Sequence, residues 1–297
     1  MNNNSGESQE LLQSFLNYLE FEKRSSKHTI SSYSLDLQGF LSFIDTIKIN
    51  ECTDKDIRNW IVYLSEQDLS PRTINRKITA VRSFFYFLQR IYAISYNPVQ
   101  KIRSLKTKKR LPFFVEKKSM NTLLDSIDFG EGFIAMRDKL IIELLYATGM
   151  RRSELLNLHV FSIDFAMKTI KIYGKRNKER IVPVLSETMQ HVADYIEERN
   201  KIADEHSFLL ITEKGKPAYE NLVYRVVKKY IAQISTIEKK SPHVLRHTFA
   251  THLLNEGADL NDIKELLGHA SLSATQIYTH NSFEKLKNIY KQSHPRN

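Results

Sequence analysis

The sequence predicts a mainly helical protein of two domains, the second of which also contains a small β-hairpin. Its 297 residues are about twice the length of a usual domain. Apolar residues recur at helical spacing through residues 9–92, and a strand pattern stands out at residues 169–184. We therefore divide the chain into an N-terminal domain (1–100), a basic linker (101–112) and a C-terminal domain (113–297).

Four amphipathic helices account for the N-terminal domain, because apolar side chains fall at the i, i+3, i+4, i+7 spacing of a buried stripe. The third helix is expected to begin at Thr53, which stands in capping-box spacing to Asp56. Ser70 and Pro71 form a good start for the fourth. The predicted stripes are Leu12, Phe15, Leu16, Leu19; Ile30, Tyr33, Leu37, Phe40, Leu41, Ile44; Ile57, Trp60, Ile61, Leu64; and Ile74, Ile78, Val81, Phe85, Leu88.

The opposite face of the fourth helix is basic, and no acidic residue occurs between Arg72 and Arg90. Such a face is either solvated charge or a surface that contacts phosphates, and the sequence leaves both open. The cations on this face are Arg72, Arg76, Lys77 and Arg82.

The linker and the hairpin follow from local composition. Residues 101–110 carry six cations and no acid, and a like-charged linker stays extended. Further along, Thr169–Tyr173 and Arg180–Val184 flank the polar, basic turn 174–178, which predicts a β-hairpin.

Composition narrows the class of function. Lys and Arg number 44 against 34 Asp and Glu, for a net charge of +10, and a basic surface attracts polyanions such as nucleic acid. One cysteine excludes an internal disulfide and a multi-thiolate metal site. The start of the chain is polar and acidic, unlike a signal peptide, and the longest apolar stretch, 140–150, is too short to cross a bilayer. We expect a cytoplasmic protein with no membrane partner.

Two familiar kinds of site can be set aside. Gly174 and Lys175 lack the other residues of a phosphate-binding P-loop, so hydrolysis of a nucleoside triphosphate is not indicated. His243 and His247 have the i, i+4 spacing of zinc ligands, but a cation and no glutamate stands between them.

The remaining chemistry-bearing residues are cations, imidazoles and one phenol. His243 and Arg246 lie near a helix N-terminus, where the backbone favours an anion, and Arg151 follows a glycine break. Singly, each has an ordinary structural explanation: a histidine in the fold, a core tyrosine, an arginine paired with Glu154. Together they form a set suited to phosphate chemistry without a metal: Arg151, Lys175, His243, Arg246, His269 and Tyr278.

These motifs resemble the active site of the tyrosine recombinase (phage integrase) family, and most closely that of the chromosomal Xer recombinases. The carrying residues are Thr-Gly-Met-Arg151, Gly-Lys175-Arg-Asn-Lys-Glu-Arg, His243-x-x-Arg246, Leu-Leu-Gly-His269 and Tyr278-Thr-His. The stretch 246–254 and the closing His294-Pro-Arg are typical of the Xer group. The resemblance implies a SAM-like core-binding domain of four helices followed by a mostly helical catalytic domain, with no arm-binding domain.

The resemblance also implies a role for each site residue. Tyr278 attacks a phosphodiester and forms a 3′-phosphotyrosyl link, while Lys175 protonates the leaving 5′-oxygen. Arg151 and Arg246 stabilise the charge on the phosphate.

His243 assists proton transfer with Tyr278, His269 hydrogen-bonds the phosphate, and Glu154 orients its neighbours. No cofactor, metal ion or nucleotide is required. Arg152 stands where the family more often has an apolar residue, so it is either exposed or a contact to the DNA backbone. The full set of DNA-contact candidates is Arg72, Arg76, Lys77, Arg82, Arg152, Arg176 and Lys178.

The implied partners are duplex DNA and further recombinase subunits. Recombination requires four active sites, so we expect a homo- or hetero-tetramer on DNA with a paralogous recombinase, and activation by a cell-division DNA translocase. The C-terminal helix with Phe283, Leu286 and Tyr290 is expected to dock on a neighbouring subunit. The implied role is resolution of chromosome dimers at a dif-like site. A mobile-element integrase or transposase, a type IB topoisomerase-like enzyme and an inactive DNA-binding relative stay open as alternatives.

Overall fold

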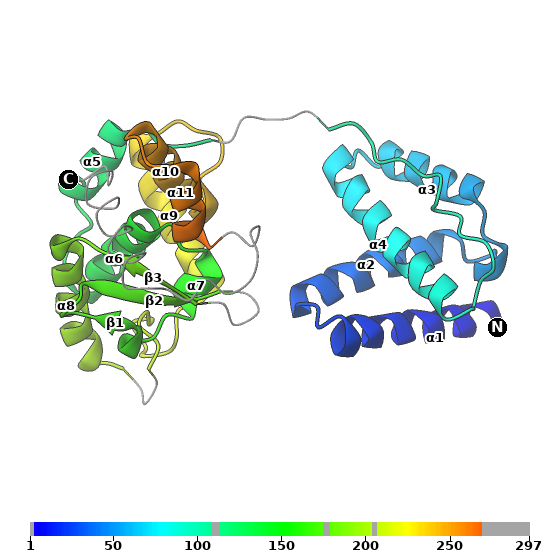
Figure 1. The fold of residues 1–297 in the computed structure, drawn as a ribbon, viewed down its shortest axis with the longest axis horizontal. Coiled ribbons are helices and arrows are strands. Elements are labelled where there is room, and N and C mark those ends of the chain that lie inside the picture. Colours follow the sequence, from blue (N-terminus) through cyan, green and yellow to red (C-terminus); the bar gives the residue numbers. More distant parts are fainter. Residues whose placement is uncertain (1–2, 108–112, 175–178, 204–206, 269–297) are drawn as a thin grey trace. The chain divides into compact units, whose positions relative to one another are not determined.

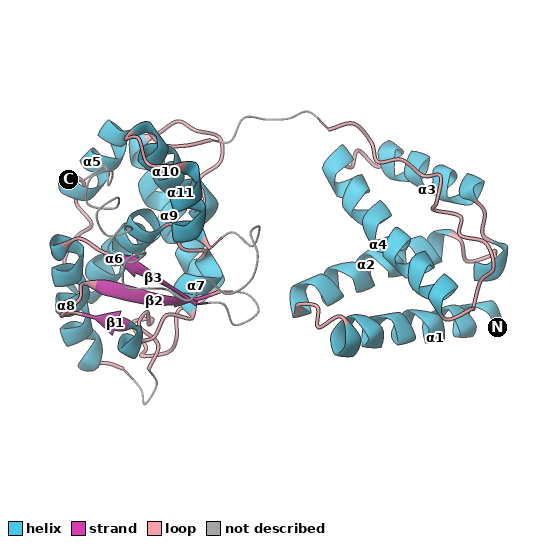
Figure 2. Ribbon diagram, in the orientation of Figure 1, coloured by secondary structure: helices cyan, strands magenta, loops and turns pink. Residues whose placement is uncertain are grey.

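The computed structural model describes residues 3–107, 113–174, 179–203 and 207–268, with side chains from Gly6 onward. The described chain is mainly helical and divides into two compact units, Met1–Arg110 and Leu111–Asn297 (Figures 1 and 2). Each unit has its own apolar core, as the pattern of the sequence predicts.

The first unit consists of the four predicted helices. They are α1 (Asn3–Asn17), continued by a π-helical turn (Tyr18–Glu22), α2 (Lys27–Phe43), α3 (Asp54–Glu66) and α4 (Pro71–Arg90), with a short 3-10 turn (Ile49–Glu51) before α3. The predicted start of α3 is confirmed, because the backbone N–H of Thr53 donates to Asp56 Oδ2 at 2.9 Å. Ser70 likewise caps α4 by accepting from the N–H of Thr73.

The predicted stripes meet in an aromatic core. Trp60 is 1% exposed and packs edge-on against Phe40, with 5.0 Å between ring centroids. Phe15 meets Phe84 in the same way at 5.4 Å. The single cysteine, Cys52, is buried in this core, and burial followed by the charge of Asp56 raises the pKa of its thiol to about 12.

The beginning of the predicted linker differs from the expected extended chain. Ile102 is 7% exposed in the first core, and Leu105 exchanges two hydrogen bonds with the side chain of Asn75 on α4. Arg82, also on α4, donates to the carbonyl of Ile102 at 2.8 Å. The charge count alone misses this packing, because two apolar residues among the cations are enough to hold the segment on the helix.

The second unit combines seven helices within the described residues with one small sheet. The helices are α5 (Lys117–Asp125), α6 (Gly132–Thr148), α7 (Arg152–Leu156), α8 (Ser186–Asn200), α9 (Glu220–Ile234), α10 (Pro242–Asn255) and α11 (Leu260–Leu267), with a 3-10 turn at Val160–Ser162. The strands are β1 (Ile163–Asp164), β2 (Thr169–Tyr173) and β3 (Glu179–Pro183).

The predicted hairpin is confirmed. Strands β2 and β3 pair antiparallel, with Lys171 opposite Ile181, and the sheet order is β1-β2-β3. The sequence did not indicate β1, because two residues are too few to show the alternation of a strand.

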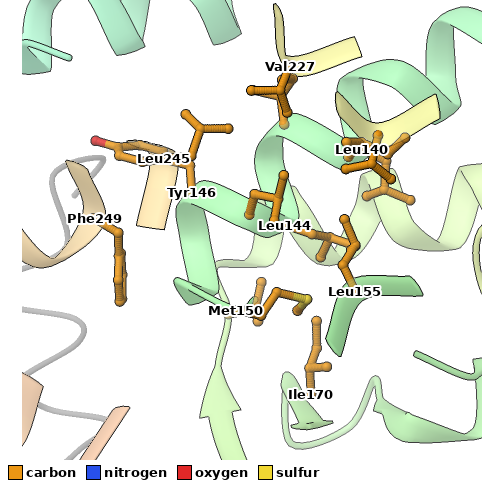
Figure 3. Close-up of a cluster of buried hydrophobic side chains, with 14 of the residues drawn as sticks. Leu140, Leu144, Tyr146, Met150, Leu155, Ile170, Val227, Leu245 and Phe249 are labelled. Atoms are coloured by element: carbon orange, nitrogen blue, oxygen red, sulfur yellow. The ribbon is translucent and has the colours of Figure 1, made fainter. Parts of the chain in front are cut away.

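Helix α6 packs against α7, α8, α9 and α10, and its apolar side chains are part of the core (Figure 3). Leu140 and Leu144 of α6 face the same cluster as Val227 of α9 and Leu245 of α10. The cluster continues past the end of α6 through Met150, which is fully buried. The chain is therefore held rigidly on both sides of the break that precedes Arg151.

Candidate active site

Arg151 and Glu154 are positioned by the turn between α6 and α7. Gly149 ends α6 in the left-handed region, at φ 58° and ψ 20°, which a glycine adopts without strain. Arg151 then caps α7, and Glu154 in the first turn accepts from the Arg151 N–H at 2.8 Å and from its Nη1 at 2.7 Å. Met150 and Leu155 anchor this turn in the core.

Arg246 reaches the same turn from α10. Its guanidinium donates from Nη1 to the carbonyl of Gly149, and from Nη2 to the carbonyl of Leu267 at 2.7 Å. The residue is 8% exposed, and burial, followed by the charges of Arg151 and Arg180, lowers its pKa to about 10. It therefore keeps its charge at neutral pH.

The end of α11 completes the described part of the site. Gly268 caps this helix at φ 63°, and its carbonyl lies 3.5 Å from Arg151 Nη2. Arg151 and Arg246, which are 95 positions apart in the sequence, thus both contact the backbone at 267–268, directly before His269. Both guanidiniums are fixed before any ligand arrives.

Arg180 also belongs to this cluster; it is the last residue of the motif Gly-Lys175-Arg-Asn-Lys-Glu-Arg, but no role was assigned to it from the sequence. It lies on β3, is 5% exposed and donates from Nη2 to Glu154 Oε2 at 2.8 Å. The available signal was its place in that motif, at the start of the second strand of the predicted hairpin. Alternation by itself does not show that the side chain points inward.

The carboxylate of Glu154 is charged in this setting. Burial raises its pKa, but the hydrogen bond and charge of Arg180 and the bonds from Arg151 outweigh burial, so the pKa lies below its ordinary 4.5. One carboxylate thus balances part of the charge of three arginines, and the cluster keeps a net positive charge that suits an anion.

The other predicted site residues divide into two groups. His243 lies in the first turn of α10, one turn before Arg246, and is exposed to solvent. Five residues lie outside the described part of the chain: Lys175, Arg176, Lys178, His269 and Tyr278. The structure does describe Gly174, the residue before Lys175, and Gly268, the residue before His269.

The basic face of α4 has a partner that the sequence analysis missed. Asp36 of α2 has a side chain 2% exposed and forms ion pairs with Arg76 and with Lys77, the latter at 3.0 Å. Arg72 is exposed in the first turn of α4. Two of the four predicted cations therefore form ion pairs with a buried carboxylate of another helix. Arg76 is also half-exposed, so it combines this ion pair with access to solvent.

Arg152 is paired as well. Its Nη2 lies 2.5 Å from Glu220 Oε2 of α9, and both side chains are partly exposed. An exposed ion pair of this kind contributes little to stability.

Neither a metal cluster nor a membrane helix is found in the described chain. Among these residues, no three or more His, Cys, Asp or Glu side chains come together as a metal ion would require. No described helix has the length and apolar character needed to span a bilayer.

Comparison with known families accounts for both units. Residues 114–285 match the model described as phage integrase family, and residues 12–91 match the phage integrase N-terminal SAM-like domain. The described ends of the candidate site, Arg151 to Gly268, fall inside the first match.

Individual relatives cover nearly the whole chain. The chain is 39% identical over 290 residues to tyrosine recombinase XerC of Bacillus subtilis, covering 95% of each protein. It is 40% identical over 293 residues to tyrosine recombinase XerC of Staphylococcus haemolyticus, covering 97% of this chain and 98% of the relative. Among solved structures, XerH site-specific recombinase bound to a palindromic difH substrate is similar in fold, with a TM-score of 0.74 and 24% identity, over 95% of this chain and 83% of that one.

Proposed function

Because the chain belongs to the phage integrase family and is a XerC-like tyrosine recombinase that acts on DNA, we propose that it resolves chromosome dimers by recombination at a dif-like site. The observation that best supports this chemistry is that the guanidiniums of Arg151 and Arg246 both contact the backbone carbonyls of residues 267–268. Arg151 and Arg246 are held by backbone carbonyls and by Glu154, so they are preorganised for a phosphate.

In the proposed reaction Tyr278 is the nucleophile. Its phenolic oxygen attacks the scissile phosphorus, the bond from phosphorus to the 5′-oxygen breaks, and a 3′-phosphotyrosyl link forms. The phenol proton passes towards His243, and the leaving 5′-oxygen takes a proton from Lys175. The 5′-hydroxyl of the partner strand then attacks the phosphotyrosine and releases Tyr278. The number of phosphodiester bonds is conserved, so the proposed cycle consumes no nucleotide.

The arginines supply electrostatic stabilisation. Charge on the non-bridging oxygens grows in the transition state, and donors fixed in advance cost no reorganisation. Removing one such donor typically lowers the rate by about 100- to 1,000-fold. In this proposal His269 donates to the same phosphate, and Glu154 keeps Arg151 in place.

The assembly belongs to the same proposal. Exchange of two duplexes needs four sites, so we propose a tetramer on DNA, with a paralogous recombinase as the partner and a DNA translocase of cell division as activator. The relative XerH is described with difH DNA in its solved structure, which supports a dif-like target for this chain.

The test uses a dif-like duplex nicked so that the cleaved end diffuses away and the covalent complex accumulates. Wild-type protein should form a complex that survives denaturation and disappears on proteolysis. Tyr278→Phe should bind the same duplex with near-normal affinity and form no such complex. A covalent complex formed by Tyr278→Phe would show that another residue is the nucleophile. Relaxation of supercoiled DNA without site preference would favour a topoisomerase, and activity confined to the ends of a mobile element would favour an integrase.

A further inference from the structure

Arg180 is a buried cation that the proposed reaction does not use. Its side chain lies on strand β3 and is 5% exposed. A guanidinium withdrawn from water is costly unless its partners are well placed. The identity of those partners therefore indicates what Arg180 does.

The first partner is the carboxylate that holds Arg151. Arg180 Nη2 donates to Glu154 Oε2 at 2.8 Å, and Arg151 Nη1 donates to Glu154 Oε1 at 2.7 Å. The two guanidiniums thus bind opposite oxygens of one carboxylate, whose side chain is 3% exposed. The side chain of Arg180 is 5% exposed, while that of Arg151 is 31% exposed.

The second neighbour is the turn that leads to His269. A Cβ added at Gly268 would lie 3.2 Å from Arg180 Nη1, which is closer than side chains normally pack, and 3.4 Å from its Cδ. Arg180 therefore fills the space beside a glycine held at φ 63°. The carbonyl of Gly268 is the one that lies 3.5 Å from Arg151.

Arg180 thus contacts Glu154, the residue that orients Arg151, and lies beside Gly268, the last described residue before His269. Its charge also matters to Glu154. After burial, which raises the pKa of this carboxyl, Arg180 is the largest influence and lowers it. Without Arg180, the buried carboxyl of Glu154 would take up a proton at a higher pH, and its ion pair with Arg151 would be lost.

We propose that Arg180 is a positioning residue for strand cleavage, which locks Glu154 against Arg151 and supports the turn at Gly268, the residue before His269 in the sequence. This inference rests on the proposed function, in which Arg151 and His269 contact the scissile phosphate. The competing explanation is an ion pair that stabilises the fold alone.

Two substitutions separate these explanations. Arg180→Met keeps much of the apolar volume and removes the charge, and Arg180→Lys keeps the charge but offers a single nitrogen. Arg199→Met is the matched control, because Arg199 is also 5% exposed but donates to the carbonyl of Phe208, outside the candidate site. Each protein is assayed as the full chain for stability, for affinity to the nicked dif-like duplex, and for the cleavage rate across a range of pH.

Arg180→Met should cleave about 100-fold more slowly, since a displacement of about 1 Å at a reacting centre costs that much, while its DNA affinity changes by less than about threefold. As the pH is lowered, its cleavage rate should begin to fall at a higher pH than the wild-type rate does, because Glu154 becomes easier to protonate. Arg180→Lys should cleave about 10-fold more slowly than wild type, with the acid side of the profile largely restored. Arg199→Met should lose stability but keep the wild-type rate and profile.

The outcomes are distinguishable. If the wild-type protein cleaves and the folded Arg180→Met protein matches its rate and pH profile, the positioning role is wrong although the proposed function stands. If Arg180→Met does not fold, the test uses Arg180→Lys instead. A wild-type cleavage rate and pH profile in Arg180→Lys would then overturn the positioning role of Arg180. A wild-type protein that forms no covalent complex with any dif-like site overturns the proposed function, and this role with it.

Discussion

Substitution of Gly149 by alanine should damage both the stability of the second unit and the candidate site. Gly149 has φ 58°, and a Cβ there would lie 2.4 Å from Phe249 Cδ1 and 2.7 Å from Leu267 Cδ2. Phe249 is fully buried and Leu267 is 6% exposed, so neither can move freely. The left-handed conformation costs an L-residue about 1–2 kcal/mol, and forcing an extra carbon into a packed core costs about 1–3 kcal/mol. We expect a total loss of about 2–5 kcal/mol.

The chain offers a convenient assay for this loss. Its single tryptophan, Trp60, is buried in the first unit, so tryptophan fluorescence follows the unfolding of that unit alone. Far-ultraviolet circular dichroism follows both units. In urea, with a slope of about 2 kcal/mol per molar, Gly149→Ala should shift the dichroism midpoint of the second unit by about 1–2.5 M and leave the Trp60 transition in place.

Gly132→Ala is the matched control for Gly149→Ala. Gly132 also has a positive φ, at 75°, but no atom lies within 4 Å of an added Cβ. This variant should show the conformational cost of about 1–2 kcal/mol without the packing cost. Equal losses in the two variants would refute the packing argument. Because the Gly149 carbonyl accepts from Arg246, Gly149→Ala should also slow covalent-complex formation, and Gly132→Ala should not.

Two further predictions concern stability. Gly39→Ala, at an exposed position inside α2 with nothing within 4 Å of the new Cβ, should stabilise the first unit by about 1 kcal/mol in the Trp60 urea transition, and a loss would show that the position is not free. His191 donates from Nδ1 to the buried carboxylate of Glu143 at 2.9 Å, and this hydrogen bond raises its pKa above the ordinary 6.5 against the effect of burial. Its stabilisation is therefore complete below pH 6.5 and is lost as the pH rises through the raised value. His191→Gln should cost about 1 kcal/mol more near about pH 6 than near about pH 9 in urea unfolding followed by circular dichroism, and a cost independent of pH would refute the charged pair.

The helices of the first unit could be predicted because each buries a regular apolar stripe. Trp60 and Phe40 occupy the interior that their spacing assigns to them. Asp36 could not be predicted as a partner, because its cations come from α4, 40 positions later, and a contact over that distance leaves no local pattern. The basic face of α4 therefore looked more open in the sequence than it is in the fold.

The candidate site shows the same limit. Spacing indicated Arg151 and Arg246, since each stands in a recognisable motif. Their placement depends on the carbonyls of Gly149 and Leu267, and backbone groups have no signature in the sequence. The role of Arg180 was missed for a related reason: its inward direction is decided by the register of β3 against β2, which a five-residue strand does not reveal.

The burial of Cys52 makes this protein well suited to distance measurements between its two units. Burial raises the pKa of the Cys52 thiol to about 12, so at neutral pH it stays protonated, and the thiolate is the form that reacts with labelling reagents. A cysteine introduced at the surface has an ordinary pKa of about 8.5 and would react far faster. Pairs of spin labels or fluorophores, one on each unit, can therefore be attached without removing the native residue, and the separation of the units can be followed before and after DNA is added.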